Sequence, residues 1–264
     1  MLRLAIPLLL VTFLSSCATT AMAPPAAVSD LAPTGKLRAA INFGNPMLAS
    51  RDASSGDARG VSVDLSRELA RRLDVPLELV TYNAAGKVVE AIKSGAWDVA
   101  YVAIDPVRGN EIGYTPAYIM LEGAYLVRLG SPIRSNAEVD RAGVRVAAAS
   151  GSAYDLFLSR ELKQAKIVRA PTSQAVTDLL IAQGLEVAAG VRQQLEADAK
   201  RVPGLRLLEG RFMVINQAMG TPKGRDAGLA YLREFIEEMK ASGFVARALE
   251  RHRIEGAAVA PPAK

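Results

Sequence analysis

The chain contains few of the residue types that catalytic and metal sites usually require. Its 264 residues include one cysteine, Cys17, and one histidine, His252. A metal site built from histidine and cysteine ligands is therefore excluded. A Ser-His-Asp triad would depend on His252, which no nucleophile-elbow motif accompanies. No glycine-rich phosphate loop is present either, so we expect no cofactor. These absences favour a binding protein over an enzyme.

The chain also lacks a concentrated basic surface. Its formal net charge is +5, aromatic residues make up 5%, and no run of five like charges occurs. Nucleic-acid-binding proteins cluster basic residues beside stacking aromatics, so we expect no nucleic-acid partner. A small positive excess helps to attract small anions.

The first 17 residues are typical of a secretion signal. Arg3 precedes an apolar stretch at 4–14 that is shorter than the about 20 residues needed to span a bilayer. Leu14-Ser15-Ser16-Cys17 resembles a lipobox, which predicts that Cys17 is lipidated and anchors the protein to a membrane in the periplasm. Ordinary signal cleavage after Ala21-Met22-Ala23, giving a soluble periplasmic protein, remains the alternative.

The composition divides the rest of the chain. Residues 18–33 are rich in Ala, Pro and Thr and predict a flexible tether, and residues 255–264 predict a disordered tail. Half of all residues are apolar, which is enough for a large core in the roughly 220 residues between these segments.

Strand and helix patterns alternate along this central part. Apolar runs predict strands, and apolar residues spaced three or four apart predict helices. The first series has strands at 36–41, 76–81 and 99–104 and helices at 61–73 and 86–93. A strand at 122–127 leads to a second series with strands at 144–148, 167–169, 187–191 and 205–207 and helices at 152–162, 173–183 and 193–200. A strand at 212–218 returns, followed by helices at 225–239 and 244–253. This order predicts an α/β fold with mostly parallel sheets flanked by helices.

The segment Ile104–Tyr118, IDPVRGNEIGYTPAY, carries the clearest functional signal. Asp105 and Pro106 suit the N-cap and first position of a short helix. Arg108 would then lie in its first turn, where a cation opposes the helix dipole. A surface arginine on a loop is one interpretation. The other is that Arg108 binds an anion, because guanidinium grips a carboxylate with two parallel hydrogen bonds.

This segment resembles the signature of the family 3 periplasmic solute-binding proteins of ABC importers. Family-like stretches follow one another in the same order: GVSVDLSRELARRL from Gly60, AIKSGAWDVAYVAI from Ala91 and VRVAAASGSAYDLFL from Val144. The resemblance covers residues 36–253. It implies two lobes joined by two crossing segments, with lobe 1 at 34–122 and 216–254 and lobe 2 at 123–215.

The resemblance also implies a ligand site in the cleft, at the carboxyl ends of the strands. Arg108 and the Gly151-Ser152 turn, with Ala153, would hold a carboxylate, and Asn42, Phe43, Asp105 and Tyr118 would line the site. A core role for Phe43 and a plain N-cap role for Ser152 remain open.

One departure from the family concerns the ligand's ammonium group. Members that bind amino acids commonly hold it with an acid where this chain has Val191, and small hydroxyl residues are replaced around Ala103. An unpaired ammonium would lie against apolar surface, which predicts a preference for carboxylates without one, unless Asp105 or Glu122 substitutes.

We therefore expect a monomeric solute-binding protein that takes up an amino-acid-like or organic carboxylate and serves an ABC permease. Two alternatives remain. Some relatives resemble cyclohexadienyl or arogenate dehydratases, which need a general acid such as Glu122 or Asp105. The chain could also be a sensory lobe that presents its ligand to a membrane receptor.

Overall fold

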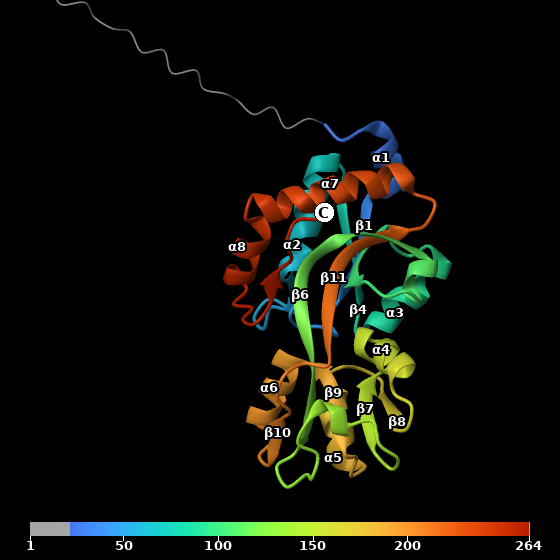
Figure 1. Ribbon diagram of the computed structural model, residues 1–264. Helices are drawn as coiled ribbons and strands as arrows, with labels where there is room; N and C mark the ends of the chain where they lie inside the picture. The colour runs from blue at the N-terminus through green and yellow to red at the C-terminus, as the bar shows by residue number, and fades with distance from the viewer. Residues whose placement is uncertain (1–21, 264) are drawn as a thin grey trace, which may run out of the picture.

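The computed structural model describes residues 22–263, which form two lobes linked by two long strands (Figure 1). The proposed signal peptide and Cys17 lie outside the described residues. The upper lobe of Figure 1 contains α1 (Pro25–Leu31), β1 (Leu37–Asn42), α2 (Val61–Leu73), β4 (Leu77–Tyr82), α3 (Ala85–Glu90), β5 (Val99–Ala103), α7 (Asp226–Ala241) and α8 (Phe244–Arg251). The lower lobe contains β7 (Arg145–Ala149), α4 (Ala153–Glu161), β8 (Lys166–Ala170), α5 (Ala175–Ala182), β9 (Val187–Val191), α6 (Arg192–Arg201) and β10 (Leu205–Leu207). The predicted two-lobed α/β fold is confirmed.

The linking strands are β6 (Ile112–Arg128) and β11 (Met213–Pro222), and they join the two lobes into one hydrogen-bonded sheet. The strand order is β4-β1-β5-β11-β6-β9-β7-β8. Neighbours are parallel within β4-β1-β5 and within β9-β7-β8, while β11 and β6 are antiparallel to their neighbours. The carboxyl ends of the parallel strands in both lobes therefore point toward the junction between the lobes.

The buried face of each helix follows its sequence pattern. In α2 the apolar residues Leu65, Leu69 and Leu73 recur every four positions and are all buried. The helix ends at Asp74, which adopts the left-handed conformation typical of a C-cap. Its bounds agree with the predicted 61–73, and it packs against β1, β4 and α8.

The crossing strand β6 is much longer than the predicted 122–127, because it begins at Ile112 and includes Pro116. Proline has no N–H to give to a sheet and normally weakens a central strand. Here the pairing with β11 shifts register between Ala218 and Gly220. The Thr115 hydroxyl oxygen accepts the N–H of Met219 at 3.1 Å across this irregularity, so the buried donor stays paired.

The predicted flexible tether at 18–33 is wrong for its later part. Residues 25–31 form α1, which packs along α7, and Leu31 is fully buried. The N–H of Gly228 donates to the Asp30 carboxylate at 2.9 Å, and an added Cβ at Gly228 would lie 2.8–3.0 Å from Asp30 and Leu31. Composition predicted flexibility, but the apolar residues of this segment have a helix to pack against.

The predicted disordered tail at 255–264 is also wrong for its described part. Residues Ala258–Val259 form β12, which pairs with β6. The N–H of Ala260 donates to the Tyr118 carbonyl at 3.0 Å, and Ala260 is buried. The tail therefore adds a short edge strand.

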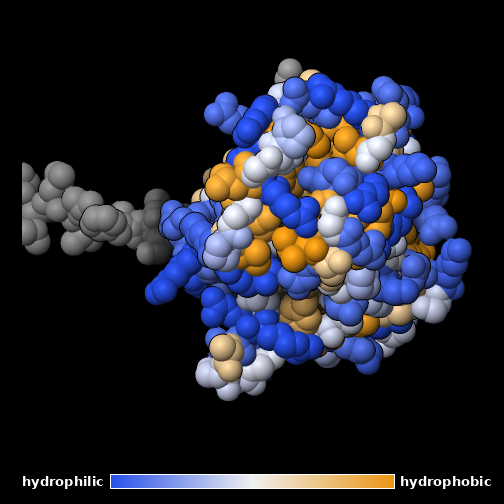
Figure 2. Space-filling model, turned by 90° about the horizontal axis from the view of Figure 1, so that it is seen from below, coloured by the Kyte–Doolittle hydropathy of each residue, from blue (hydrophilic) through white to orange (hydrophobic). Residues whose placement is uncertain are grey.

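Within the described residues, no helix is long and apolar enough to cross a membrane. Viewed from below, the lower lobe carries apolar patches between polar side chains (Figure 2). Leu129 and Ile181 are large apolar residues exposed in this lobe.

Candidate functional site

A cavity lies where the strand ends of the two lobes meet. Its empty volume is about 690 Å³, its open mouth included. It is lined from the upper lobe by Asn42 after β1 and by the end of β5, and from the lower lobe by the turn after β7 and by Val191 at the end of β9. This is the position at which open α/β sheets bind ligands.

The cavity has one charged residue in its wall. Among the lining residues between 22 and 263, Arg108 is the only charged side chain and none is acidic. The uncharged polar lining residues are Asn42, Asn45, Tyr101, Ser150, Ser152, Tyr154, Ser173, Gln194 and Gln217. The same described part of the chain contains no group of three potential metal ligands. The cavity is therefore suited to an anionic or neutral molecule.

Arg108 is buried between the lobes, with 3% of its surface exposed. It begins a short 3-10 turn, and the Asp105 side chain accepts the N–H of Val107 in the approach to that turn. One terminal nitrogen of the guanidinium donates to the Ala103 carbonyl at 3.0 Å and the other to the Gly151 carbonyl at 2.7 Å. Its Nε has no hydrogen-bond partner among the described residues.

Burial lowers the pKa of the Arg108 guanidinium, while Tyr114 and Asp105 nearby act in the opposite direction. Arginine nevertheless remains a cation in proteins. The guanidinium is held by neutral carbonyls and forms no ion pair with a carboxylate among the described residues, and a buried donor without a partner is costly. Both deficits would be relieved by a ligand carboxylate.

The predicted anion turn at the start of α4 is built from Gly151, Ser152 and Ala153. Ser152 caps the helix, because its hydroxyl accepts the N–H of Asp155 at 3.0 Å. The N–H of Gly151 donates to the Asp155 carboxylate at 2.8 Å, and Arg169 binds the same carboxylate. Ser152 and Ala153 line the cavity. Gly151 lines a second hollow, which Arg108 also borders.

Gly151 also brings the two lobes into close contact. It has φ +66°, in the left-handed region that favours glycine, and an added Cβ would lie 2.9 Å from the Gly86 Cα of the upper lobe. A side chain at this position would push the lobes apart.

Two acids that could have bound an ammonium are engaged elsewhere, and neither lines the cavity. Asp105 is buried and pairs with Arg160 of the lower lobe at 2.9 Å. Glu122 pairs with Arg192 at 2.7 Å and Arg211 at 2.8 Å, and these arginines lower the pKa of its carboxyl.

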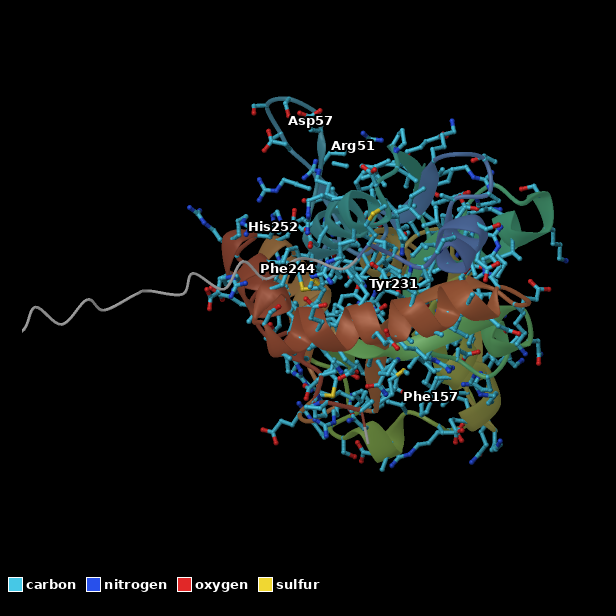
Figure 3. The ribbon with its side chains drawn as sticks, turned by 90° about the horizontal axis from the view of Figure 1, so that it is seen from above. Arg51, Asp57, Phe157, Tyr231, Phe244 and His252 are labelled. Carbon is cyan, nitrogen blue, oxygen red and sulfur yellow. The ribbon has the colours of Figure 1, made fainter. Side chains whose placement is uncertain are left out.

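The two residues predicted in the loop after β1 have different positions. Asn42 lines the cavity, and its side-chain oxygen accepts the N–H of Gly44 at 2.9 Å. Phe43 faces a separate surface hollow, where the Arg51 guanidinium lies 4.5 Å from its ring centre. Arg51 belongs to the hairpin of β2 (Ser50–Arg51) and β3 (Ala58–Arg59), whose loop, with Asp57, extends from the upper lobe (Figure 3). Phe43 therefore does not line the cavity.

The expectation that Tyr118 lines the site is not met. Tyr118 is fully buried in the core, and its ring meets the ring of Tyr101 edge-on at 6.2 Å. Tyr101 lines the cavity instead, and its hydroxyl bonds to Ser66 at 3.0 Å. Burial raises the pKa of both phenols.

Sequence reasoning did not identify Gln217 as a lining residue. Gln217 is 4% exposed, and its Oε1 has no hydrogen-bond partner among the described residues. It lies in β11, opposite Ala103 of β5. Two adjacent amides, Asn216 and Gln217, in an otherwise apolar run from Val214 to Met219 were the available signal. Which of the two faces the cavity depends on how β11 crosses the sheet.

A comparison with protein-family models finds one match. The model of the bacterial extracellular solute-binding proteins, family 3, matches residues 37–254. A search of curated proteins finds no significant match.

Solved structures share the fold. A solute receptor for L-cysteine of Neisseria gonorrhoeae superposes with a TM-score of 0.75 at 21% identity, covering 87% of this chain and 94% of that one. An amino acid ABC transporter substrate-binding protein from Streptococcus pneumoniae, bound to L-arginine, gives 0.72 at 18% identity and covers 86% and 97%. An ancestral amino-acid-binding protein described as a precursor of cyclohexadienyl dehydratase gives 0.71 at 19% identity and covers 85% and 98%.

Proposed function

Because this chain belongs to the bacterial extracellular solute-binding proteins, family 3, we propose that it captures a small carboxylate-bearing solute and delivers it to an ABC permease. The solute binds in the cavity between the lobes, and the protein acts as a monomer without a cofactor. Its carboxylate pairs with Arg108, with the turn at Ser152 and Ala153 beside it.

The observation that carries this proposal is the environment of Arg108. Among the described lining residues of the interlobe cavity the guanidinium is the only charge, and its Nε is buried without a partner in that part of the chain. A carboxylate would supply the missing countercharge and accept this hydrogen bond.

Thermal unfolding with a panel of amino acids, 2-hydroxy acids and 2-oxo acids tests the proposal. A ligand at a hundredfold excess over its Kd stabilises the fold by about 2.7 kcal/mol, which raises the Tm by roughly 5–10 °C. Arg108→Gln should abolish the shift. Arg134→Gln, which changes an exposed arginine of the lower lobe, should retain it. An undiminished shift in Arg108→Gln would contradict the proposed role of Arg108.

A dehydratase is the second candidate, favoured by the structural similarity to the precursor of cyclohexadienyl dehydratase. Such an enzyme needs a general acid at the site. None of the described lining residues is acidic, and Asp105 and Glu122 are paired with arginines. These observations favour binding without turnover. Consumption of arogenate or prephenate by the purified protein would establish the enzyme instead.

We also propose that the protein is extracytoplasmic and anchored by lipid on Cys17. The basis is the Leu14-Ser15-Ser16-Cys17 sequence together with the family. Two or more acyl chains give stable anchoring where one is marginal. Cys17→Ser should move the protein from the membrane fraction to the soluble periplasmic fraction. Unchanged fractionation, with no incorporation of labelled palmitate into the wild type, would favour a soluble periplasmic protein.

A further inference from the structure

The charge on the described cavity lining is positive only. Arg108 contributes a positive charge, and no described lining residue contributes a negative one. A ligand carboxylate placed at Arg108 is neutralised. An ammonium on the neighbouring carbon would be desolvated without a countercharge, and burying an unpaired ion is costly.

Three acids near the cavity wall, Asp105, Glu122 and Asp155, are already held by arginines. Asp105 pairs with Arg160, and Asp155 pairs with Arg169 at 3.0 Å while accepting the Gly151 N–H. Glu122 is held by two arginines. Moving any of these three to an ammonium would break a formed ion pair, so none of the three is a ready substitute.

Gln217 is an uncharged polar residue close to Arg108, the residue proposed to bind the ligand carboxylate. Ala103 connects the two: its carbonyl accepts a hydrogen bond from Arg108, and it lies opposite Gln217 in the β5–β11 pair. Gln217 is 4% exposed, and its Oε1 is buried and lacks a partner among the described residues. An amide accepts from a hydroxyl through its oxygen and donates to a carbonyl through its nitrogen.

We infer that Gln217 recognises the substituent beside the ligand carboxylate, and that the ligand is a carboxylic acid whose neighbouring substituent is polar and uncharged. This inference rests on the proposed function. A 2-hydroxy or 2-oxo acid has this chemistry, whereas an α-amino acid brings a second charge that the cavity does not balance.

Matched sets of ligands test this on the whole mature protein. Alanine, lactate and pyruvate form one set; leucine, 2-hydroxyisocaproate and 2-oxoisocaproate a second; glutamate, 2-hydroxyglutarate and 2-oxoglutarate a third. Within every set that shifts the Tm, titration calorimetry should give the hydroxy or oxo acid a Kd at least about tenfold lower than that of the amino acid. The hydroxy and oxo members separate the two uncharged substituents.

Gln217→Glu should reverse the preference toward the amino acid, because the new carboxylate pairs with the ammonium. Gln183→Glu makes the same change at an exposed amide of the lower lobe that does not line the cavity, and it should leave the preference for the uncharged substituent in place. If Gln217→Glu does not fold, Gln217→Met should raise the Kd of the hydroxy and oxo acids at least about fivefold and leave that of the amino acid unchanged.

The outcomes separate this inference from the proposed function. Tighter binding of the amino acids by the wild type would overturn the inference and leave a carboxylate-binding protein. An equal reversal in Gln183→Glu, or no reversal in a folded Gln217→Glu, would overturn the role of Gln217. No Tm shift with any member of any set would overturn the proposed function, and this inference with it.

Discussion

At the residue scale, Ser152 has two structural roles. Its hydroxyl caps the N-terminus of α4, and its side chain lines the cavity. Loss of such a cap costs about 1 kcal/mol. Ser152→Ala should therefore lower the Tm of the ligand-free protein by roughly 2–4 °C. Ligand stabilisation should persist, because the hydroxyl is engaged by Asp155. Thermal unfolding with and without ligand measures both quantities.

Ser150→Ala is the matched control, since Ser150 also lines the cavity but is exposed and caps no helix. Its Tm should stay close to that of the wild type. If Ser152→Ala instead abolishes the ligand shift at an unchanged Tm, then Ser152 contacts the ligand and its capping role is minor.

The sequence predicted the type of ligand-binding residue at the site better than it predicted which strand side chains face the cavity. Arg108 lines the cavity because its position follows directly from the end of β5. Tyr118 was assigned to the site, yet it lies in the core. Strand alternation shows that neighbouring residues face opposite sides, but it does not say which side borders the cleft. Tyr101 and Gln217 were not predicted for the same reason.

At the element scale, helix α1 precedes the residues matched by the family model, and its contribution to stability can be measured. Leu31 is fully buried at the contact with α7. Leu31→Ala should destabilise the protein by about 2–5 kcal/mol and lower the Tm by roughly 5–15 °C, because it leaves a cavity in the core. Met22→Ala is the control: Met22 precedes the same helix and is 85% exposed, so its effect should stay within about 0.5 kcal/mol. Equal Tm values for the two variants would mean that α1 does not dock in solution.

The elements that the sequence predicted well are those whose pattern is local. The bounds of α2 and β9 agree with prediction because apolar spacing and end signals define both ends. The early part of β6 was missed, since Pro116 normally argues against a central strand. Next to this proline, the Thr115 hydroxyl accepts the N–H of Met219 in β11, a strand that lies about a hundred residues later in the chain. Helix α1 and strand β12 likewise depend on partners far along the chain.

At the scale of the whole molecule, polar contacts next to the cavity join the loops of the two lobes. Arg108 donates to the Gly151 carbonyl, Asp105 pairs with Arg160, and Gln174 of the lower lobe donates to the Phe43 carbonyl at 3.2 Å. The ion pair is partly shielded, with side-chain exposures of 3% for Asp105 and 37% for Arg160. These contacts hold the closed arrangement around the cavity.

Removing one of these contacts should shift the balance between closed and open forms. Asp105→Asn keeps an oxygen to accept the Val107 N–H but loses the charge that attracts Arg160. We expect a loss of roughly 1 kcal/mol from the closed form, allowing for partial exposure, which raises the open-to-closed ratio about fivefold. Small-angle X-ray scattering of the ligand-free protein should then give a larger radius of gyration. Asp178→Asn removes an ion pair to Arg201 within the lower lobe and should leave the scattering curve unchanged. Identical curves for the wild type and both variants would show that the Asp105–Arg160 pair does not hold the lobes together.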